Sequence, residues 1–323
     1  MIQAAIIGLG RWGRNLVESV QHSSNQIQFT LAVVQNLDKH RDFAQSKNLQ
    51  LSDRFQDALE DLAIQLIVIA TPHNLHIKQI VAAANAGKNV LCEKPLALSV
   101  QEAQIAIDAC KAFGVQLGVG HDKRYWPSMQ ALQKVVLSGS LGNLIHIEGN
   151  FSNENSKIIS SVWRNEPENI PGGSITATGI HIVDAFVNLM GPISKVQGKY
   201  IAHKNSKEFH DSMSLLCEFE SGTTGVISSV RPTPLFWRIH IFGDLGSAEV
   251  NGQNMMNIYS QGKSVEVQQF EPLNALRFQL ELMARSIENT EPYPMGEKQM
   301  INTVKAFVAS AKALDEGIVI KTK

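Results

Sequence analysis

The residues with the clearest chemical meaning form a glycine-rich turn near the start of the chain. Gly8, Gly10 and Gly13 are spaced as GxGxxG in "AAIIGLGRWGRNLVESV", with Arg11 and Trp12 before the last glycine. Gly8 permits a tight turn, Gly10 lets the backbone approach a pyrophosphate, and Gly13 allows a helix to pack close to the preceding strand. Free N–H groups at the start of that helix would face the anion. The turn therefore predicts dinucleotide binding, and a merely structural glycine turn is the alternative.

The residues after the second apolar run bear on the choice of cofactor. An acidic residue at this place would hold the ribose 2′-hydroxyl of NAD, but the chain has Gln35 and Asn36. Neither side chain repels a 2′-phosphate, and Lys39 or Arg41 could reach one, although Asn or Gln can also bond a hydroxyl. Asp38 is expected to cap the following helix. The sequence thus predicts NAD or NADP, with a slight preference for NADP.

Two further side chains could move protons. Lys94 follows the apolar run 89–92, and open α/β sheets bind their ligands at the carboxyl ends of such strands. His181 lies in "ATGIHIVD", where Thr178 and Asp184 are three residues away and within reach on a helix. The imidazole could act as a general base, and Asp184 could orient the ring or serve a structural role. The alternatives are a packed core histidine and a surface lysine beside a turn.

The pattern of the first 120 residues shows which elements position these groups. Short, continuously apolar runs rich in β-branched residues alternate with helix-length stretches, as expected for strands that are buried on both faces. This order predicts a doubly wound parallel sheet. Ser99 is expected to cap one helix, with Glu102 reaching back to its start. The apolar runs are 4–7, 31–34, 66–70, 89–92 and 115–119.

After about residue 122 the pattern changes to alternating segments with glycine turns, which indicates antiparallel strands. We therefore expect an α/β Rossmann domain over residues 1–122 and an α+β domain over residues 123–323. The alternating segments include 144–151, 214–230 and 238–250, and helical patterns cover about 128–138, 272–289 and 297–315.

Composition and charge argue against several classes of partner. The 29 basic and 30 acidic residues give a net charge of −1, and the absence of a basic run argues against nucleic-acid binding. No signal-peptide pattern is seen at the start, and no segment approaches the roughly 20 apolar residues of a membrane span. Three widely spaced cysteines without a CxxC pair suit a reducing compartment. We expect a cytoplasmic protein whose partner is a small molecule.

Longer stretches resemble the Gfo/Idh/MocA family of NAD(P)-dependent oxidoreductases. "ATPHNLHIKQIVAAANAGKNVLCEKPLALS" carries ATPxxxH and then AGKxVLCEKP, while "VGHDKRYWP", "GGSITATGIHIVD" and "FGDLGSAEV" resemble three later segments of the family. The resemblance spans nearly the whole chain. It implies a Rossmann domain followed by an α+β domain on a large, mostly antiparallel sheet that is often used for oligomerisation. It also implies a homo-oligomer that oxidises or reduces a carbonyl or alcohol carbon of a sugar, a sugar nucleotide or a cyclitol.

The resemblance also implies the site residues. It places Lys94 beside the nicotinamide and the reacting oxygen, which Lys94 would polarise or protonate, and His181 would complete the proton path. Pro95 is expected in a fixed turn, because the peptide before it is often cis in the family. His76 would lie near the cofactor, with a capping or packing role as the alternative. No metal is expected. The cofactor-binding set comprises Gly8, Gly10, Arg11, Trp12, Gly13, Gln35, Asn36, Ala70, Thr71, Pro72, His76, Glu93 and Lys94, and the substrate-binding set comprises Lys94, Arg124, Trp163, Thr178 and His181.

Departures from the family pattern bear on activity. The family helix carries an acid four residues before its histidine, where this chain has Ala177. A carboxylate there would favour the charged imidazole and orient the ring, but its loss need not remove the base. Asp122 stands where the family often has Asn, and Arg124 matches its Arg and could bind a hydroxyl or structure the hinge. The loss at Ala177 favours an alternative function, a nucleotide-binding regulator or sensor without catalysis, whereas retention of Lys94 and His181 favours the enzyme.

Overall fold

The described residues of the chain form two compact units. The first unit comprises residues 1–122 and 274–300, and the second comprises the described residues of 123–273 and 301–323. We expected residues 274–300 in the second domain, and this assignment is wrong. Helix α8 (Ala275–Ile287) packs on helix α1 (Arg11–Val20) of the first unit. The structure, a computed structural model, describes residues 1–153, 171, 173, 175–201, 212–230 and 233–322.

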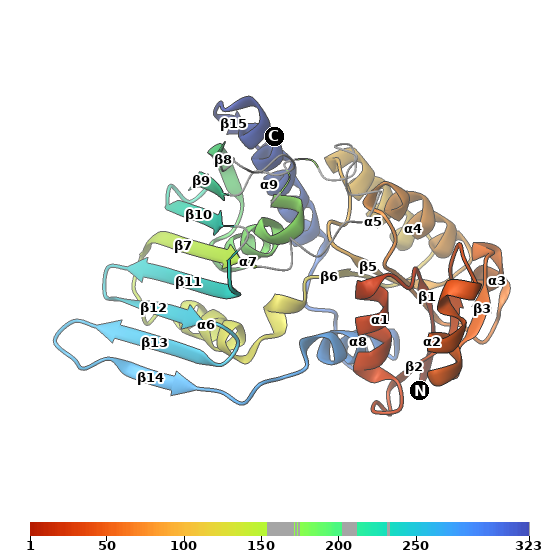
Figure 1. Cartoon of the computed structure of the whole chain (residues 1–323). Helices are drawn as coiled ribbons and strands as arrows, with labels where there is room; N and C mark the ends of the chain where they lie inside the picture. The colour runs from red at the N-terminus through yellow and green to blue at the C-terminus, as the bar shows by residue number, and fades with distance from the viewer. Residues whose placement is uncertain (154–170, 172, 174, 202–211, 231–232, 323) are drawn as a thin grey trace. The chain divides into compact units, whose positions relative to one another are not determined.

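In the described part of the first unit, six strands form a parallel sheet, here called the first sheet (Figure 1). The predicted doubly wound parallel sheet is therefore confirmed. The strands are β1 (Ile2–Ile7), β2 (Ile27–Val33), β3 (Gln50–Ser52), β4 (Leu66–Ile69), β5 (Asn89–Glu93) and β6 (Leu117–Gly120), in the order β3-β2-β1-β4-β5-β6. Strand β3 was not predicted, because it is short and its first two side chains are not buried. The order switches between β1 and β4, and ligands of open α/β sheets bind outside the carboxyl ends of strands at such a switch.

Helix α5 of the first unit starts where the sequence indicates. The predicted cap of α5 is confirmed, because the Ser99 hydroxyl accepts the Glu102 N–H at 3.2 Å. The Glu102 carboxylate in turn accepts the Leu98 N–H at 3.3 Å, so two N–H groups at the helix start are satisfied reciprocally. Besides α1 and α8, the helices are α2 (Arg41–Ser46), α3 (Phe55–Glu60), α4 (His76–Asn85) and α5 (Val100–Ala112).

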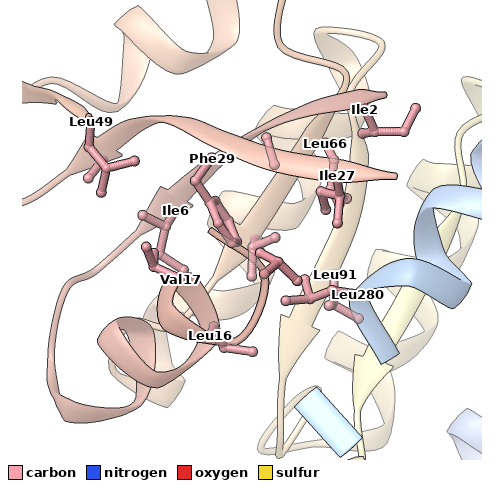
Figure 2. Close-up of a cluster of buried hydrophobic side chains, with 14 of the residues drawn as sticks. Ile2, Ile6, Leu16, Val17, Ile27, Phe29, Leu49, Leu66, Leu91 and Leu280 are labelled. Carbon is pink, nitrogen blue, oxygen red and sulfur yellow. The ribbon is translucent and has the colours of Figure 1, made fainter. Parts of the chain in front are cut away.

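The core of the first unit explains why α8 belongs to it. Figure 2 shows Leu16 of α1, Phe29 of β2, Leu91 of β5 and Leu280 of α8 in one cluster of apolar side chains. Each of the four is at most 2% exposed, and burying a side chain of this size stabilises the fold by about 1.5–3 kcal/mol. Leu280 thus ties α8 to strands whose core residues Leu91 and Phe29 lie 189 and 251 residues earlier in the sequence.

In the described part of the second unit, nine strands form a mostly antiparallel sheet, here called the second sheet (Figure 1). Its architecture confirms the α+β expectation, and β7 and β10 are neighbours that run parallel. The helices of this unit are α6 (Pro127–Leu137), α7 (Ile180–Met190) and residues 301–316 of α9 (Glu297–Glu316). The strand order is β14 (Glu266–Gln269), β13 (Met255–Ser260), β12 (Gly246–Asn251), β11 (Phe236–Gly243), β7 (Leu144–Ser152), β10 (Thr224–Val230), β9 (Ser212–Phe219), β8 (Ile193–Ile201) and β15 (Ile320–Lys321).

Side chains of the second sheet alternate between two faces. Helices α6 and α7 lie against one of them, the inner face (Figure 1). The contact of α7 with β7 is so close that a Cβ at Gly149 would lie 2.4 Å from the Ile182 side chain. The opposite face, here called the outer face, carries a row of side chains in register across neighbouring strands: Leu216, Val226, Glu148, His240 and Glu249.

Candidate functional site

The glycine turn follows β1, and each glycine is needed for a different reason. Gly8 has a φ of +96°, and a Cβ there would lie 2.8 Å from the Ala70 carbonyl oxygen. A Cβ at Gly13 would lie 2.0 Å from the Gly8 carbonyl oxygen, so α1 could not pack against the turn with any other residue. Gly10 differs, because no atom of the described residues other than Gly10 and its two chain neighbours lies within 4 Å of the position of its Cβ. The backbone at Gly10 is therefore open to a ligand.

The start of α1 fits the pyrophosphate of a dinucleotide. Gly10 is the N-cap residue, and among the described residues no side chain caps the helix. The first turn contains Arg11, Trp12 and Gly13, and it has no acidic residue. The N–H groups of this turn and the helix dipole favour an anion. These residues belong to the cofactor-binding set expected from the sequence, and their contacts with a cofactor stay a prediction.

The turn after β2 is organised by Asn36. Its side-chain oxygen accepts the Lys39 N–H at 3.0 Å, within the 3-10 turn Asp38–His40, whose N-cap residue is Leu37. The expectation for Asp38 is wrong, because its carboxylate pairs with the Arg41 guanidinium at 2.5 Å instead. Gln35 is exposed beside Asn36.

A basic pair that the sequence analysis missed lies next to this turn. Arg14 Nη2 lies 3.1 Å from His40 Nδ1, and the Arg14 guanidinium lies 4.8 Å above the centre of the Phe43 ring. Burial lowers the pKa of His40, and the charges of Arg14 and Lys39 lower it further. The signal that could have found this pair is an arginine directly after the third glycine of the motif.

The loop after β4 lies against the glycine turn. The Ala70 N–H donates to the Ile7 carbonyl oxygen at 2.9 Å, so this loop continues alongside β1. The Thr71 hydroxyl donates to the Gln79 side-chain oxygen at 2.6 Å. Pro72 then precedes the 3-10 turn His73–Leu75 that leads into α4. Two residues of the expected cofactor-binding set, Ala70 and Thr71, thus lie next to Gly8, and Pro72 follows them in the chain.

Glu93 is the last residue of β5, and Lys94 follows it at the carboxyl end of the strand. The Glu93 side chain is buried and lies directly over Gly120, where a Cβ would be 2.6 Å from a carboxylate oxygen. Burial and, to a smaller extent, the Asp122 carboxylate raise the pKa of Glu93 to about 7, against the opposite effects of Trp12 and Lys94. The Trp12 indole N–H lowers the pKa of Glu93, although the two groups do not meet in the geometry of a normal hydrogen bond. The Lys94 N–H donates to Glu93 Oε2 at 3.3 Å, and the Lys94–Pro95 peptide is cis, as expected.

His76 is the first residue of α4 and is completely buried. Its Nδ1 lies 2.8 Å from the Pro95 carbonyl oxygen, and its Nε2 lies 3.1 Å from the Thr71 carbonyl oxygen. Of the roles considered for His76, these contacts favour packing within the protein, next to two loops of the expected cofactor site.

In the second unit, His181 is the second residue of α7 and is 6% exposed. Its ring meets the Phe151 ring edge-on at 5.7 Å between centres. The preceding five residues, Ile175–Gly179, form a turn of π-helix that contains Ala177 and Thr178. Turns of this kind are rare and frequently occur at functional sites. The Thr178 hydroxyl lies 3.3 Å from the Ser229 hydroxyl.

Arg124 and Asp184 form a buried ion pair in the second unit. Both carboxylate oxygens of Asp184 accept hydrogen bonds from Arg124, each at 2.7 Å. Arg124 Nη1 also donates to the Asn188 side-chain oxygen at 3.2 Å. These contacts give Asp184 and Arg124 a structural role, and their expected roles in orienting His181 and binding substrate stay predictions. Trp163 lies outside the described residues.

Lys94 and His181, the two residues expected to act on the substrate, belong to different units. Within the described residues, no group of three or more His, Cys, Asp or Glu side chains is arranged to hold a metal ion. Nor is any helix of this part of the chain long and apolar enough to cross a membrane.

Comparisons with known proteins agree with this geometry. D-xylose 1-dehydrogenase (NADP(+)) 2 of Haloferax volcanii is 24% identical over 320 residues, which cover 95% of each chain. scyllo-inositol 2-dehydrogenase (NADP(+)) of Bacillus subtilis is 26% identical over 179 residues, 55% of this chain and 49% of its own. The chain spans about half the length of two other relatives, uncharacterised oxidoreductases of Schizosaccharomyces pombe and Streptococcus pneumoniae, of which it covers 42% and 55%.

A solved structure of levoglucosan dehydrogenase with NADH and L-sorbose has the same fold, with a TM-score of 0.87 and 17% identity, over 100% of this chain and 99% of the other. Residues 2–121 match the model of an oxidoreductase family with an NAD-binding Rossmann fold, and residues 129–249 match the GFO/IDH/MocA C-terminal domain. Because these two matches together cover most of the chain, the chain belongs to the GFO/IDH/MocA family of oxidoreductases.

Proposed function

We propose that the protein is an NAD(P)-dependent dehydrogenase or reductase that acts on a carbonyl or alcohol carbon of a sugar, a sugar nucleotide or a cyclitol. The observation that carries this proposal is the uncapped start of α1 with its open Gly10, at the same sheet edge as Lys94. The substrate class follows from relatives that are named as dehydrogenases of D-xylose and scyllo-inositol.

The nicotinamide ring, when bound, supplies the hydride chemistry. In our proposal the N–H groups at the start of α1 bind the pyrophosphate, and Ala70, Thr71 and Pro72 line the path toward the nicotinamide. Lys94 holds the substrate oxygen and stabilises the charge that develops on it. His181 takes or gives the proton of the hydroxyl group. Thr178 and Arg124 serve the substrate side of the site.

For the cofactor we propose NADP rather than NAD. The turn after β2 lacks an acid at Gln35 and Asn36, and the only nearby acid in the described turn, Asp38, is paired with Arg41. Arg14, whose Nη2 lies 3.1 Å from His40 Nδ1, adds positive charge beside the same turn. A 2′-phosphate would gain charge-assisted hydrogen bonds from such groups. The expected result is tighter binding of NADPH than of NADH in a fluorescence titration.

The test of the proposed activity is a panel of D-xylose, scyllo-inositol, levoglucosan and related polyols with NAD and NADP, followed by nicotinamide absorbance. Lys94→Ala is the matched control, and we expect it to lower kcat by at least about a hundredfold with a smaller change in cofactor affinity. Turnover at the parent rate in Lys94→Ala would place the chemistry elsewhere.

One observation favours a second function, a nucleotide-binding regulator or sensor on the same fold. Ala177 replaces the acid that the family carries one helical turn before its histidine. This function predicts that NADPH or NADH binds to the protein but that no compound of the panel is turned over. The enzyme predicts turnover that depends on Lys94.

We also propose that the protein is a cytoplasmic homo-oligomer that associates through the outer face of the second sheet. This face exposes apolar side chains, among them Leu216 at 51% and Phe236 at 47%. Leu216→Lys should shift the sedimentation coefficient toward that of the monomer, while Ile105→Lys, at a 53% exposed position on α5, should not. A parent chain that sediments as a monomer would contradict the proposal. The three cysteines are free and buried, which supports a reducing compartment.

A further inference from the structure

His76 connects two loops that end neighbouring strands of the first sheet. His76 is the first residue of the ten-residue helix α4 and is 0% exposed. One ring nitrogen faces the Pro95 carbonyl oxygen after β5, and the other faces the Thr71 carbonyl oxygen after β4. Strands β4 and β5 are hydrogen-bonded neighbours, so the ring lies between the two loops at their carboxyl edge.

The two contacts of His76 are not equivalent. Burial lowers the pKa of His76 below its ordinary value of 6.5, although the backbone groups of Pro95, Thr71 and Leu96 act in the opposite direction. The neutral ring has one N–H and can therefore donate to one of the two carbonyl oxygens at a time. We assign the proton to Nδ1, because its distance of 2.8 Å to the Pro95 oxygen is shorter than the 3.1 Å from Nε2 to the Thr71 oxygen.

The Pro95 contact bears directly on Lys94. Pro95 follows Lys94 and has no backbone N–H. Its carbonyl oxygen is therefore the only backbone group of Pro95 that can form a hydrogen bond and hold the loop next to Lys94. The Lys94 N–H itself makes a long hydrogen bond of 3.3 Å to Glu93. The hydrogen bond from His76 to Pro95 therefore holds the backbone of Lys94, which carries the Lys94 side chain, in place.

We propose that His76 is a positioning residue, which holds the backbone of Lys94 in place through the Pro95 carbonyl oxygen. The proposal rests on the proposed function, in which Lys94 contacts the reacting oxygen. A displacement of a reacting group by about 1 Å can lower a rate about a hundredfold. Loss of the Pro95 hydrogen bond should thus lower kcat, with little change in the binding of the cofactor.

Two substitutions separate the two contacts. In His76→Asn the amide N–H₂ group can take the place of Nδ1 and donate to Pro95, whereas in His76→Gln it can take the place of Nε2 and donate to Thr71. We expect His76→Gln to lower kcat by about 10- to 100-fold and His76→Asn to stay within about threefold of the parent. The KM and the Kd for NADPH should change by less than about threefold in both variants.

Hydrogen–deuterium exchange tests the same hydrogen bond without a measurement of enzyme activity. Amide hydrogen–deuterium exchange of the peptide that spans residues 93–99 should be faster in His76→Gln than in the parent, and close to the parent in His76→Asn. Both variants remove one buried contact, so their loss of Tm should be similar. A purely structural role would make kcat follow Tm and would not distinguish the two amides.

Lys88→Met is the matched control for a lost backbone tether. Lys88 is buried, and its Nζ donates to the carbonyl oxygens of Asp61 at 2.6 Å and Ile64 at 2.8 Å. It lies before β5, at the opposite edge of the first sheet from Lys94. Lys88→Met should lower Tm but leave kcat unchanged.

Three outcomes overturn the proposal: equal kcat in His76→Asn and His76→Gln, unchanged exchange of residues 93–99 in His76→Gln, or a kcat loss in Lys88→Met of the same size. Failure of the proposed function is recognised separately, because Lys94→Ala would then turn over at the parent rate. In that case the exchange experiment still shows whether His76 holds the loop, but Lys94 has no reaction for which it is positioned, and the proposal falls with it.

Discussion

Asp184 of α7 holds the guanidinium group of Arg124 through two hydrogen bonds of 2.7 Å, 60 residues away in the sequence. The two side chains are 3% and 6% exposed. Breaking a buried pair of this kind by removing one partner typically costs about 3–5 kcal/mol, because a charge is left buried without compensation.

Asp184→Asn should therefore lower the free energy of unfolding by about 3–5 kcal/mol in urea titrations. The control is Lys195→Gln in the same unit, which breaks a pair with Glu218 whose side chains are 40% and 51% exposed. An exposed pair contributes about 0–1 kcal/mol. Equal losses in the two variants would show that the Arg124 pair has no special structural weight.

The glycine turn gives a prediction in which binding and folding separate. Gly10→Val has room for its side chain and a φ of −63°, which any residue adopts. We expect an unchanged Tm and at least about a hundredfold weaker NADPH binding, because the side chain occupies the place of the pyrophosphate. Gly13→Ala should instead lower Tm, since its Cβ would meet the Gly8 carbonyl oxygen at 2.0 Å. Calorimetry that finds parental affinity in Gly10→Val would refute the binding assignment.

Glu93 predicts a pH dependence of stability. Its pKa is raised from 4.5 to about 7 in the folded chain, chiefly by burial, so the folded state binds the proton more tightly than the unfolded state. The stabilisation is fully present below pH 4.5, falls as the pH rises toward 7, and is lost above that value. The expected loss is on the order of 3 kcal/mol.

Glu93→Gln imitates the protonated carboxyl group and should remove most of this loss. The measurement is the free energy of unfolding of parent and variant, without cofactor, across this pH range. Parallel pH profiles of the two proteins would mean that Glu93 is ionised alike in the folded and unfolded states.

Arg14 and His40 predict how cofactor preference depends on pH. The pKa of His40 is lowered by burial and by Arg14 and Lys39, whereas a bound 2′-phosphate would favour the charged ring. NADPH affinity should therefore rise as the pH falls below 6.5, and NADH affinity should not. Arg14→Leu should weaken NADPH binding about tenfold and leave NADH binding within about twofold. An equal loss of affinity for both cofactors would show that Arg14 does not contact the 2′-phosphate.

His181 is expected to be the general base. The prediction tests it together with Ala177, the position at which the family carries an acid. His181→Ala should lower kcat by about 10²–10⁴-fold and remove an ionisation from the pH–rate profile. Ala177→Asp should move that ionisation to higher pH, because a nearby carboxylate favours the charged imidazole. Both variants are compared with the parent on the best substrate of the panel. Parental rates in His181→Ala at every pH would make His181 a core residue.

The sequence by itself determined the elements whose cause is local. The apolar runs that became β1, β2, β4, β5 and β6 are continuous, because parallel strands are buried on both faces. The glycine turn, the cap of α5 at Ser99 and the place of Lys94 after β5 likewise follow from residues a few positions apart. Asn36 shows the limit of local inference, since the sequence favoured Asp38 as a helix cap, whereas Asn36 accepts the Lys39 N–H and Asp38 pairs with Arg41.

Only the tertiary structure decided which distant residues meet. The helical pattern of α8 shows that one face must be buried, but not that Leu280 joins the core of the first unit. The pKa of Glu93 depends on its burial, to which packing over Gly120 of the next strand contributes, and on the Asp122 carboxylate after that strand. The partner of Asp184 lies on another segment. Burial and electrostatic energies depend on distances through space, and residue types along a chain do not specify those distances until the strands have paired and the helices have packed.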